Sequence, residues 1–434
     1  MKKTESVRWS LMALCCFVTV AGAVADRYDE PPIEYSKADD SNAVSQMAAD
    51  LADGTLVLER SAPFGYLKPL LAYLGVPQES QVLVFSKTSL QTRFISPDSP
   101  RAIYFNDDIY VGAVKYSGTI EISTADPKLG TAFYTLSEHE SGRPMITRQT
   151  DNCLQCHAST LTDGFPGHIV RSVYPDAEGF PILQAGTHVT THESPFVERW
   201  GGWYVTGTHG SMRHMGNSIA VPTEYAAEID TEAGANRTDL THVADLGDYL
   251  TPHSDIVALM VLEHQTRMHN LMTSADFETR LALRDQAIMD EALNRSGGEL
   301  SESTQRRIAS AGSKLVDYLL FAREVPLKSA IAGTSGFAEW FTAQGPRDSL
   351  GRSVREFDLR TRLFKYPLSY LIYSAQFDAL PVEMREYVYA RLWGILTGGA
   401  DAERYPHLDE GTRKAIRQIL AETKTNLSSH WKAD

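Results

Sequence analysis

Short apolar runs alternate with turn residues along the first half of the chain, as in the strands of an antiparallel sheet. Asn106-Asp107-Asp108 lies between two of these runs and predicts a tight turn. The runs are rich in β-branched and aromatic residues, so we expect a strand from each. The expected strands are residues 82–85, 93–95, 102–105, 109–111, 119–122 and 132–135, with shorter ones at 168–174, 182–186 and 203–206.

After residue 250 the pattern changes to helical spacing. Thr251 suits an N-cap, and Pro252 suits the first position of a helix. Side chains at intervals of three and four then form one stripe from Val257 through His264 to Leu271, which predicts an amphipathic helix. Further helices are expected at residues 275–293, 303–322, 382–397 and 412–424, two short ones at 43–51 and 66–74, and a long connection at 323–356.

These patterns predict an α+β fold with an antiparallel, β-rich N-terminal half and a mainly helical C-terminal half. The length of 434 residues agrees with two or three domains. We expect a signal peptide at residues 1–25, a flexible lead-in at 26–45, a β-rich haem-c domain at 46–250 and a helical domain at 251–434.

The N-terminus has the three parts of a secretory signal peptide. Lys2 and Lys3 begin a basic start, an apolar run follows, and Ala23-Val24-Ala25 matches the small-residue cleavage site. No later apolar run is long enough to span a bilayer, so we expect a soluble protein in the periplasm or otherwise exported. The formal net charge of −14 disfavours nucleic acid and anionic lipid as partners.

The segment that carries recognisable chemistry is Cys-Leu-Gln-Cys-His at residues 153–157. Cys-x-x-Cys-His is the pattern to which c-type haem is covalently attached. Two of the four cysteines lie in the predicted signal peptide, which leaves Cys153 and Cys156 in the mature chain. We therefore expect one covalent haem c on these two thiols, with His157 as the proximal iron ligand.

Three other uses of a cysteine pair fit this sequence less well. A thioredoxin-like pair should follow a buried strand, whereas residues 148–152 are wholly polar. A zinc site would need further cysteines, and the mature chain has none. A structural disulfide remains compatible with export.

The ligand on the other side of the iron decides the chemistry, because a second strong ligand makes an electron carrier and an open site admits small molecules. The loop at residues 208–216 holds two histidines and two methionines, and we take Met215 or His214 as the distal ligand. His168 is a second candidate, and a surface role is the alternative for it. His264 lies on an apolar stripe, where a histidine is most often part of the core.

Haem propionates usually meet arginine, backbone amide or indole donors. Arg148 and Arg171 flank the motif in sequence, Trp200 and Trp203 lie farther along the chain, and all four are candidates for that role. The chain contains no G-x-S-x-G, no P-loop and no G-x-G-x-x-G pattern, which disfavours the corresponding hydrolases and nucleotide-binding proteins.

Residues 153–157 resemble the attachment segment of c-type cytochromes. The longer chain is similar to a set of uncharacterised, exported, single-haem proteins of environmental bacteria that carry only a cytochrome c domain label. Residues 103–108, 171–175, 198–203 and 362–367 give that similarity. The resemblance implies haem binding and electron transfer, and it implies no particular substrate.

Two classes of function follow from these expectations. The first is an exported monohaem electron-transfer protein that docks with a redox partner protein. The second is a haem-dependent oxidoreductase or a gas-binding sensor, in which the distal site is open. The sequence leaves open whether the protein is an enzyme.

Overall fold

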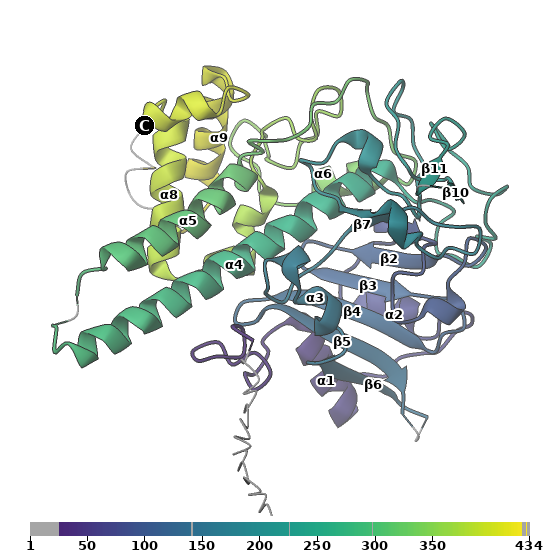
Figure 1. The fold of residues 1–434 in the computed structure, drawn as a ribbon, viewed down its shortest axis with the longest axis horizontal. Coiled ribbons are helices and arrows are strands. Elements are labelled where there is room, and N and C mark those ends of the chain that lie inside the picture. Colours follow the sequence, from purple (N-terminus) through teal and green to yellow (C-terminus); the bar gives the residue numbers. More distant parts are fainter. Residues whose placement is uncertain (1–25, 140–141, 225, 297, 428–430, 432–434) are drawn as a thin grey trace, which may run out of the picture.

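The computed structural model describes residues 26–139, 142–224, 226–296, 298–427 and 431. The N-terminal half is rich in antiparallel sheet, and the C-terminal half is mainly helical, with helices between residues 256 and 423. The predicted α+β class is therefore confirmed (Figure 1). The predicted signal peptide at residues 1–25 lies outside the described residues. Within the described part of the chain, a helix with the length and apolarity to cross a membrane was not found.

Seven antiparallel strands form the central sheet, in the order β6-β5-β4-β3-β2-β1-β9. The turn predicted at Asn106 is confirmed, because Asn106 Oδ1 accepts hydrogen bonds from the N–H groups of Asp108 and Ile109 and closes the β2–β3 hairpin. The strands of the sheet are β1 (Val82–Val84), β2 (Arg101–Phe105), β3 (Ile109–Ala113), β4 (Thr119–Asp126), β5 (Gly130–Glu138), β6 (Pro144–Gln149) and β9 (Trp203–Tyr204).

Two of the expected strands are wrong. Residues Thr92–Phe94 and Leu183–Ala185 are short 3₁₀ helices, because hydrogen bonds to carbonyls three residues back hold them in local turns. Beside the sheet lie two small hairpins, formed by β7 (Arg171–Val173) with β8 (Thr187–Val189) and by β10 (Ala220–Pro222) with β11 (Ala227–Ile229).

Helix α4 is one continuous helix of 37 residues, where the sequence predicts two. It begins after Asp255, whose carboxylate accepts hydrogen bonds from the first N–H groups, and not at Thr251 as expected. The helices are α1 (Ala43–Asp53), α2 (Leu67–Tyr73), α3 (Leu154–His157), α4 (Ile256–Ala292), α5 (Glu302–Leu319), α6 (Phe337–Ala343), α7 (Ala375–Asp378), α8 (Val382–Leu396) and α9 (Glu410–Thr423).

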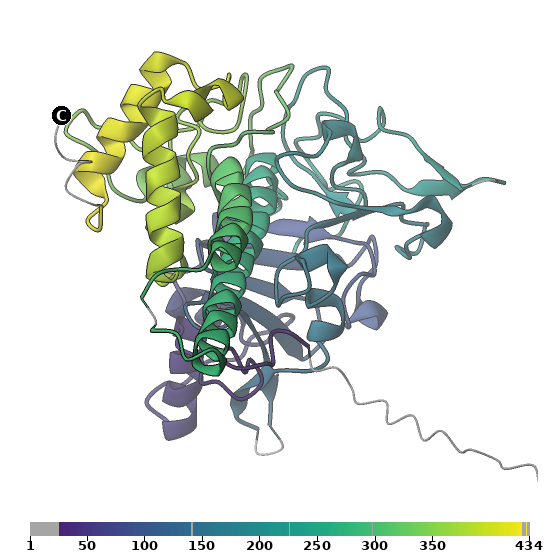
Figure 2. The same cartoon turned by 60° about the vertical axis from the view of Figure 1, so that its left-hand side comes forward.

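Different helices cover the two faces of the sheet. On one face, apolar side chains of α1 and α2 join those of the sheet in a common core. On the other face, Ser123 pairs across the strands with both Tyr110 and Phe133, so these three side chains project together. There Gln265 of α4 donates a hydrogen bond to the Tyr110 hydroxyl at 2.9 Å. Helix α4 runs across this face, and α3 lies over its β4 and β5 side (Figures 1 and 2).

The segments predicted as separate parts share packing with the sheet. In the predicted lead-in, Tyr35 is fully buried and its hydroxyl donates to the Thr131 carbonyl at 2.8 Å. One hydrophobic core joins strand residues such as Val84 and Phe105 to residues of α4, α5 and α8. The helical half is thus packed directly onto the sheet that holds residues 153–157.

Candidate functional site

The Cys-x-x-Cys-His segment forms a single helical turn, α3, directly after the edge strand β6. The N–H of His157 donates to the carbonyl of Cys153 at 3.0 Å, which closes the turn. Leu154 is buried and anchors the turn in the core, whereas Cys153 is half-buried and Cys156 is exposed. Neither thiol is in a disulfide. The turn therefore carries two unpaired thiols at its outer side.

The two thiols do not resemble an activated redox pair. Burial, with a smaller contribution from the Glu121 carboxylate, raises the pKa of the Cys153 thiol to about 11. A reactive disulfide-exchange cysteine has a lowered pKa instead. Within the described residues, no three His, Cys, Asp or Glu side chains gather as a metal site, so a zinc site gains no support.

A hydrogen bond to the backbone holds the imidazole of His157 in place. Its Nδ1 lies 2.8 Å from the carbonyl oxygen of Gly167, and because a carbonyl only accepts, Nδ1 carries the proton. The Nε2 atom is then the nitrogen with the free lone pair, and it has no hydrogen bond to a described residue. Burial lowers the pKa of His157, which favours the neutral ring. A neutral imidazole with a fixed tautomer is the form that ligates iron.

The sheet surface beside His157 carries an aromatic ring and, farther along, an ion pair. The ring of Phe133 lies 4.9 Å from the His157 ring, between centroids. Farther along the same face, Arg101 and Glu121 form an ion pair at 2.5 Å, and both side chains are half-buried. This ion pair contributes to the pKa values of both Cys153 and His157, so it lies near the turn.

Of the candidate distal histidines, His168 is the one that lies near Phe133 on this face of the sheet. Its ring lies 6.3 Å from that of Phe133 and 4.2 Å from that of Tyr110, and its Nδ1 is 3.3 Å from the Ser123 hydroxyl. Burial is the main cause that lowers its pKa well below the usual value. Its Nε2 is buried and has no hydrogen-bond partner, which is costly for a polar atom.

Met215 and His214 are buried in a different part of the molecule. The Met215 sulfur accepts a hydrogen bond from the Ser172 hydroxyl at 3.6 Å. The Nδ1 of His214 accepts from the Gly216 N–H at 3.0 Å, and its ring packs against that of Trp200. Among the described residues, no hydrogen bond or ring contact joins either side chain to residues 153–157. The assignment of the distal ligand to this loop stays a prediction.

His264 belongs to a sealed polar network that sequence reasoning missed. Its Nδ1 is 2.8 Å from Nδ1 of His192, and its Nε2 is 2.9 Å from the Ser369 hydroxyl. One residue earlier on α4, the fully buried Glu263 is ion-paired with Arg199. The only sequence signal was the placement of Glu263 and His264 on an apolar helix. Their partners lie more than sixty residues away along the chain.

The four proposed propionate donors each form a hydrogen bond to another group of the protein. Arg148 donates to the carbonyls of Tyr35 and Ala38, and Arg171 donates to the Thr187 hydroxyl. The indole N–H groups also have partners. That of Trp200 donates to Glu263, and that of Trp203 to the Arg171 carbonyl.

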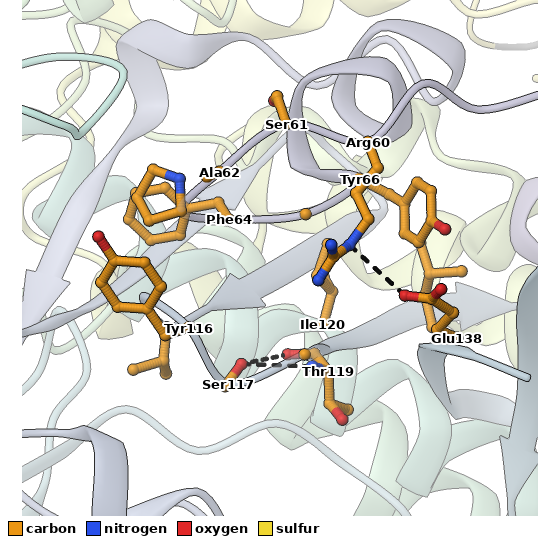
Figure 3. Close-up of a pocket in the computed structure, with 15 residues that line it drawn as sticks. Arg60, Ser61, Ala62, Phe64, Tyr66, Tyr116, Ser117, Thr119, Ile120 and Glu138 are labelled. Carbon is orange, nitrogen blue, oxygen red and sulfur yellow. Dashed lines mark hydrogen bonds and ion pairs between the residues drawn. The ribbon is translucent and has the colours of Figure 1, made fainter. Parts of the chain in front are cut away.

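Two cavities of the described structure lie away from the Cys-x-x-Cys-His turn. One of about 170 Å³ lies at the end of the sheet, between residues 60–66 and the β3–β4 connection (Figure 3). Its polar side chains pair with one another, as in the contact of Arg60 with Glu138 at 3.5 Å. A broader depression of about 600 Å³ is lined mainly by residues 241–247. The chemistry of residues 153–157 makes the turn and the adjoining sheet face the better candidate site.

The residues present fit a covalently held haem. Two unpaired thiols stand one helical turn apart, and the adjacent imidazole has its proton fixed on Nδ1. The buried, unpartnered Nε2 of His168 lies on the far side of the Phe133 ring. No protein-family model, no curated protein and no solved structure matches this chain.

Proposed function

We propose that this chain is an exported monohaem c-type cytochrome-like protein that takes part in electron transfer. Cys153 and Cys156 would hold one haem covalently, and His157 would ligate its iron. A redox partner protein would dock at the exposed side of the turn. When bound, haem supplies one-electron redox chemistry.

One observation carries this proposal. The hydrogen bond from His157 Nδ1 to the Gly167 carbonyl directs the free lone pair to Nε2, on the same turn as both thiols. A histidine that donates through its other nitrogen to a carbonyl is the usual arrangement of a metal-ligating imidazole. The backbone therefore presets both the protonation and the orientation of the ring.

The residues around the turn have different roles at the proposed site. Leu154 anchors the turn in the core, so that both thiols project from a fixed base. The Phe133 ring packs against His157 and limits the access of water to one side of the imidazole. Burial raises the pKa of the Cys153 thiol to about 11, so this thiol lacks the lowered pKa of a disulfide-exchange cysteine.

The alternative, a haem-dependent redox enzyme or gas sensor with an open distal site, has one observation in its favour. His168 is a buried, uncharged imidazole whose Nε2 has no partner, and Phe133 separates it from His157. An unpartnered Nε2 near an open iron site is able to hydrogen-bond a small ligand. The two functions differ in whether the iron binds an external ligand.

The test is expression of the full chain with c-type haem maturation machinery in an exported form. We expect covalent haem in the wild type and none in the Cys153→Ala, Cys156→Ala double variant. Gln155→Ala is the matched control, because Gln155 is exposed on the same turn and has no expected role. A wild type without covalent haem would refute the proposal.

Optical spectra with and without carbon monoxide separate the two functions. A low-spin spectrum that carbon monoxide leaves unchanged supports electron transfer. Rapid binding of carbon monoxide refutes the simple carrier and supports the open site. Single replacements of Met215, His214 and His168 would then locate the distal ligand.

A further inference from the structure

We propose that Asn270, on helix α4, is a positioning residue that sets the strength of the hydrogen bond to His157. This inference rests on the proposed function, because its consequence is the reduction potential of a haem ligated by His157. Asn270 lies 102 residues beyond His168 in the sequence and is buried, with 3% of its surface exposed.

Asn270 binds both backbone polar groups of His168. Its Oδ1 accepts from the His168 N–H at 2.8 Å, and its Nδ2 donates to the His168 carbonyl at 2.7 Å. A single side chain thus pairs with the backbone as a neighbouring strand would. The position of the peptide group between residues 167 and 168 is fixed from the helical half of the molecule.

That peptide group is the one that holds His157. Its carbonyl oxygen accepts from His157 Nδ1, and its N–H donates to Asn270 Oδ1. The two groups lie in one rigid plane, since the peptide bond is planar. Hydrogen bonds linked through one peptide group polarise one another. The bond from the His168 N–H to Asn270 Oδ1 therefore makes the Gly167 oxygen a stronger acceptor for His157 Nδ1. Asn270 therefore acts on the imidazole of His157 without touching it.

Gly167 gives independent support for this contact. A Cβ atom on Gly167 would stand 2.5 Å from Asn270 Oδ1 and 2.9 Å from its Cγ. The side-chain amide therefore lies closely against the backbone, and only glycine leaves room for it. Gly167 does not have a positive φ, so the close approach of Asn270, and not the backbone conformation, explains the glycine.

The helix that carries Asn270 is itself held in place on both sides. The preceding residue, His269, bonds the Asp107 carbonyl at 2.9 Å and Gln376 Oε1 at 2.6 Å. One turn earlier, Arg267 pairs with Asp163 at 2.8 Å, in the loop that follows α3. The amide of Asn270 is thus presented on a rigid element.

The expected effect is on the reduction potential. A strong hydrogen bond at Nδ1 makes the imidazole a more basic ligand, which favours the oxidised iron. Loss of the Asn270 amide weakens that bond, so Asn270→Ala should shift the potential upward. Gly167→Ala should shift it in the same direction, because the added methyl group displaces the amide.

Asn270→Asp distinguishes positioning from a merely structural role. The aspartate keeps an oxygen that accepts from the His168 N–H, so its potential should stay at or below that of the wild type. Thr279→Ala is the control for damage to the helix, since Thr279 is buried on α4 and bonds only the Ala275 carbonyl of its own helix. It should leave the potential unchanged.

The experiment compares the potentials of these holoproteins by redox titration and follows amide hydrogen exchange at His168. An unchanged potential in Asn270→Ala, or an equal upward shift in Asn270→Asp, overturns the inference. If Asn270→Ala does not fold, Gly167→Ala and Asn270→Asp still decide the question. Absence of covalent haem in the wild type refutes the proposed function instead, and is recognised before any potential is measured.

Discussion

The molecule uses histidine in two regions that differ in what they leave unpaired. At the Cys-x-x-Cys-His turn, His157 is half-buried, one of its nitrogens is bonded to the backbone and the other is free of protein partners. In the network around Glu263, both nitrogens of His264 are bonded to other side chains and the ring is fully buried. The same residue type therefore serves two purposes.

The Glu263 network is almost fully paired, and its exception is the buried Nε2 of His192, which has no hydrogen-bond partner. The Glu263 network bonds mainly to itself, through Arg199, Trp200 and the pair of His192 and His264. Trp200 even adopts a left-handed backbone conformation, with a φ of +65°, which is strained for a bulky residue. The network fixes how α4 packs, whereas the turn at residues 153–157 is the place where we propose that haem binds.

Removal of Arg199 is expected to have the largest effect on stability. Arg199→Ala leaves the buried Glu263 without its ion-pair partner, which should cost about 3–5 kcal/mol of the free energy of unfolding. Denaturant unfolding measures this loss. The control is Arg267→Ala, whose partly exposed pair with Asp163 should cost less than about 1 kcal/mol. Equal losses in the two variants would contradict the distinction between the regions.

The next largest effect is expected from acid, which should lower the stability that the buried histidines contribute. Burial lowers the pKa of His264 and of His214 to about 3, from an ordinary value of 6.5. The unfolded chain takes up these protons first, so the stability contributed by each ring is complete above pH 6.5 and is lost as the pH falls toward 3. Each should cost up to about 1.4 kcal/mol per pH unit.

Buried carboxyl groups oppose this loss at milder pH. Burial raises the pKa of Glu263 and Glu324 to about 7 and that of Asp276 to about 6. Each group therefore stabilises the folded state more as the pH falls toward the ordinary pKa of that carboxyl group. The net loss of stability should therefore be steepest below pH 4.5, where Glu263 is protonated in both states. Unfolding midpoints across pH measure it, and a stability maximum below pH 4.5 would contradict this assignment.

A smaller effect is expected from Ser369→Ala. The substitution removes the hydroxyl that bonds His264 Nε2 and leaves that buried atom unpaired. The free energy of unfolding should fall by about 1–3 kcal/mol, and denaturant unfolding would show it. No change would mean that His264 is paired in another way.

The smallest stability effect is expected at the turn itself. His157→Ala removes one hydrogen bond from a half-buried side chain, so the free energy of unfolding of the haem-free chain should fall by only about 1 kcal/mol. The optical spectrum of the haem-loaded protein should change strongly in the same variant. A loss comparable to that of Arg199→Ala would show that the turn is structural.

The fold class and one local turn could be predicted from the sequence, and distant pairing could not. The fold class and the β2–β3 turn follow from periodicity and from an asparagine that bonds its own neighbours. The candidate haem segment is recognisable because covalent attachment fixes the spacing of Cys153, Cys156 and His157. The strand expected at residues 93–95 failed because local turn hydrogen bonds outweighed its β propensity.

The remaining site residues had no sequence signal of their own. His192 meets His264 across 72 residues, and Asn270 meets His168 across 102. A lone polar residue on a mostly apolar helix is equally compatible with solvent, core or partner. Only the crossing of α4 over the sheet brings these side chains together (Figure 1).

The length of chain between Asn270 and His168 has a consequence for the order of folding. The turn of α3 closes through contacts only four residues apart, whereas the Asn270 contact closes a loop of 102 residues. Loops of that size are entropically costly and form late. The two thiols would thus be displayed on a nearly complete turn while the helix above them is still undocked. If haem is attached to these thiols as proposed, an attachment enzyme would meet them while they are accessible, and the later docking of α4 would fix the backbone that holds His157.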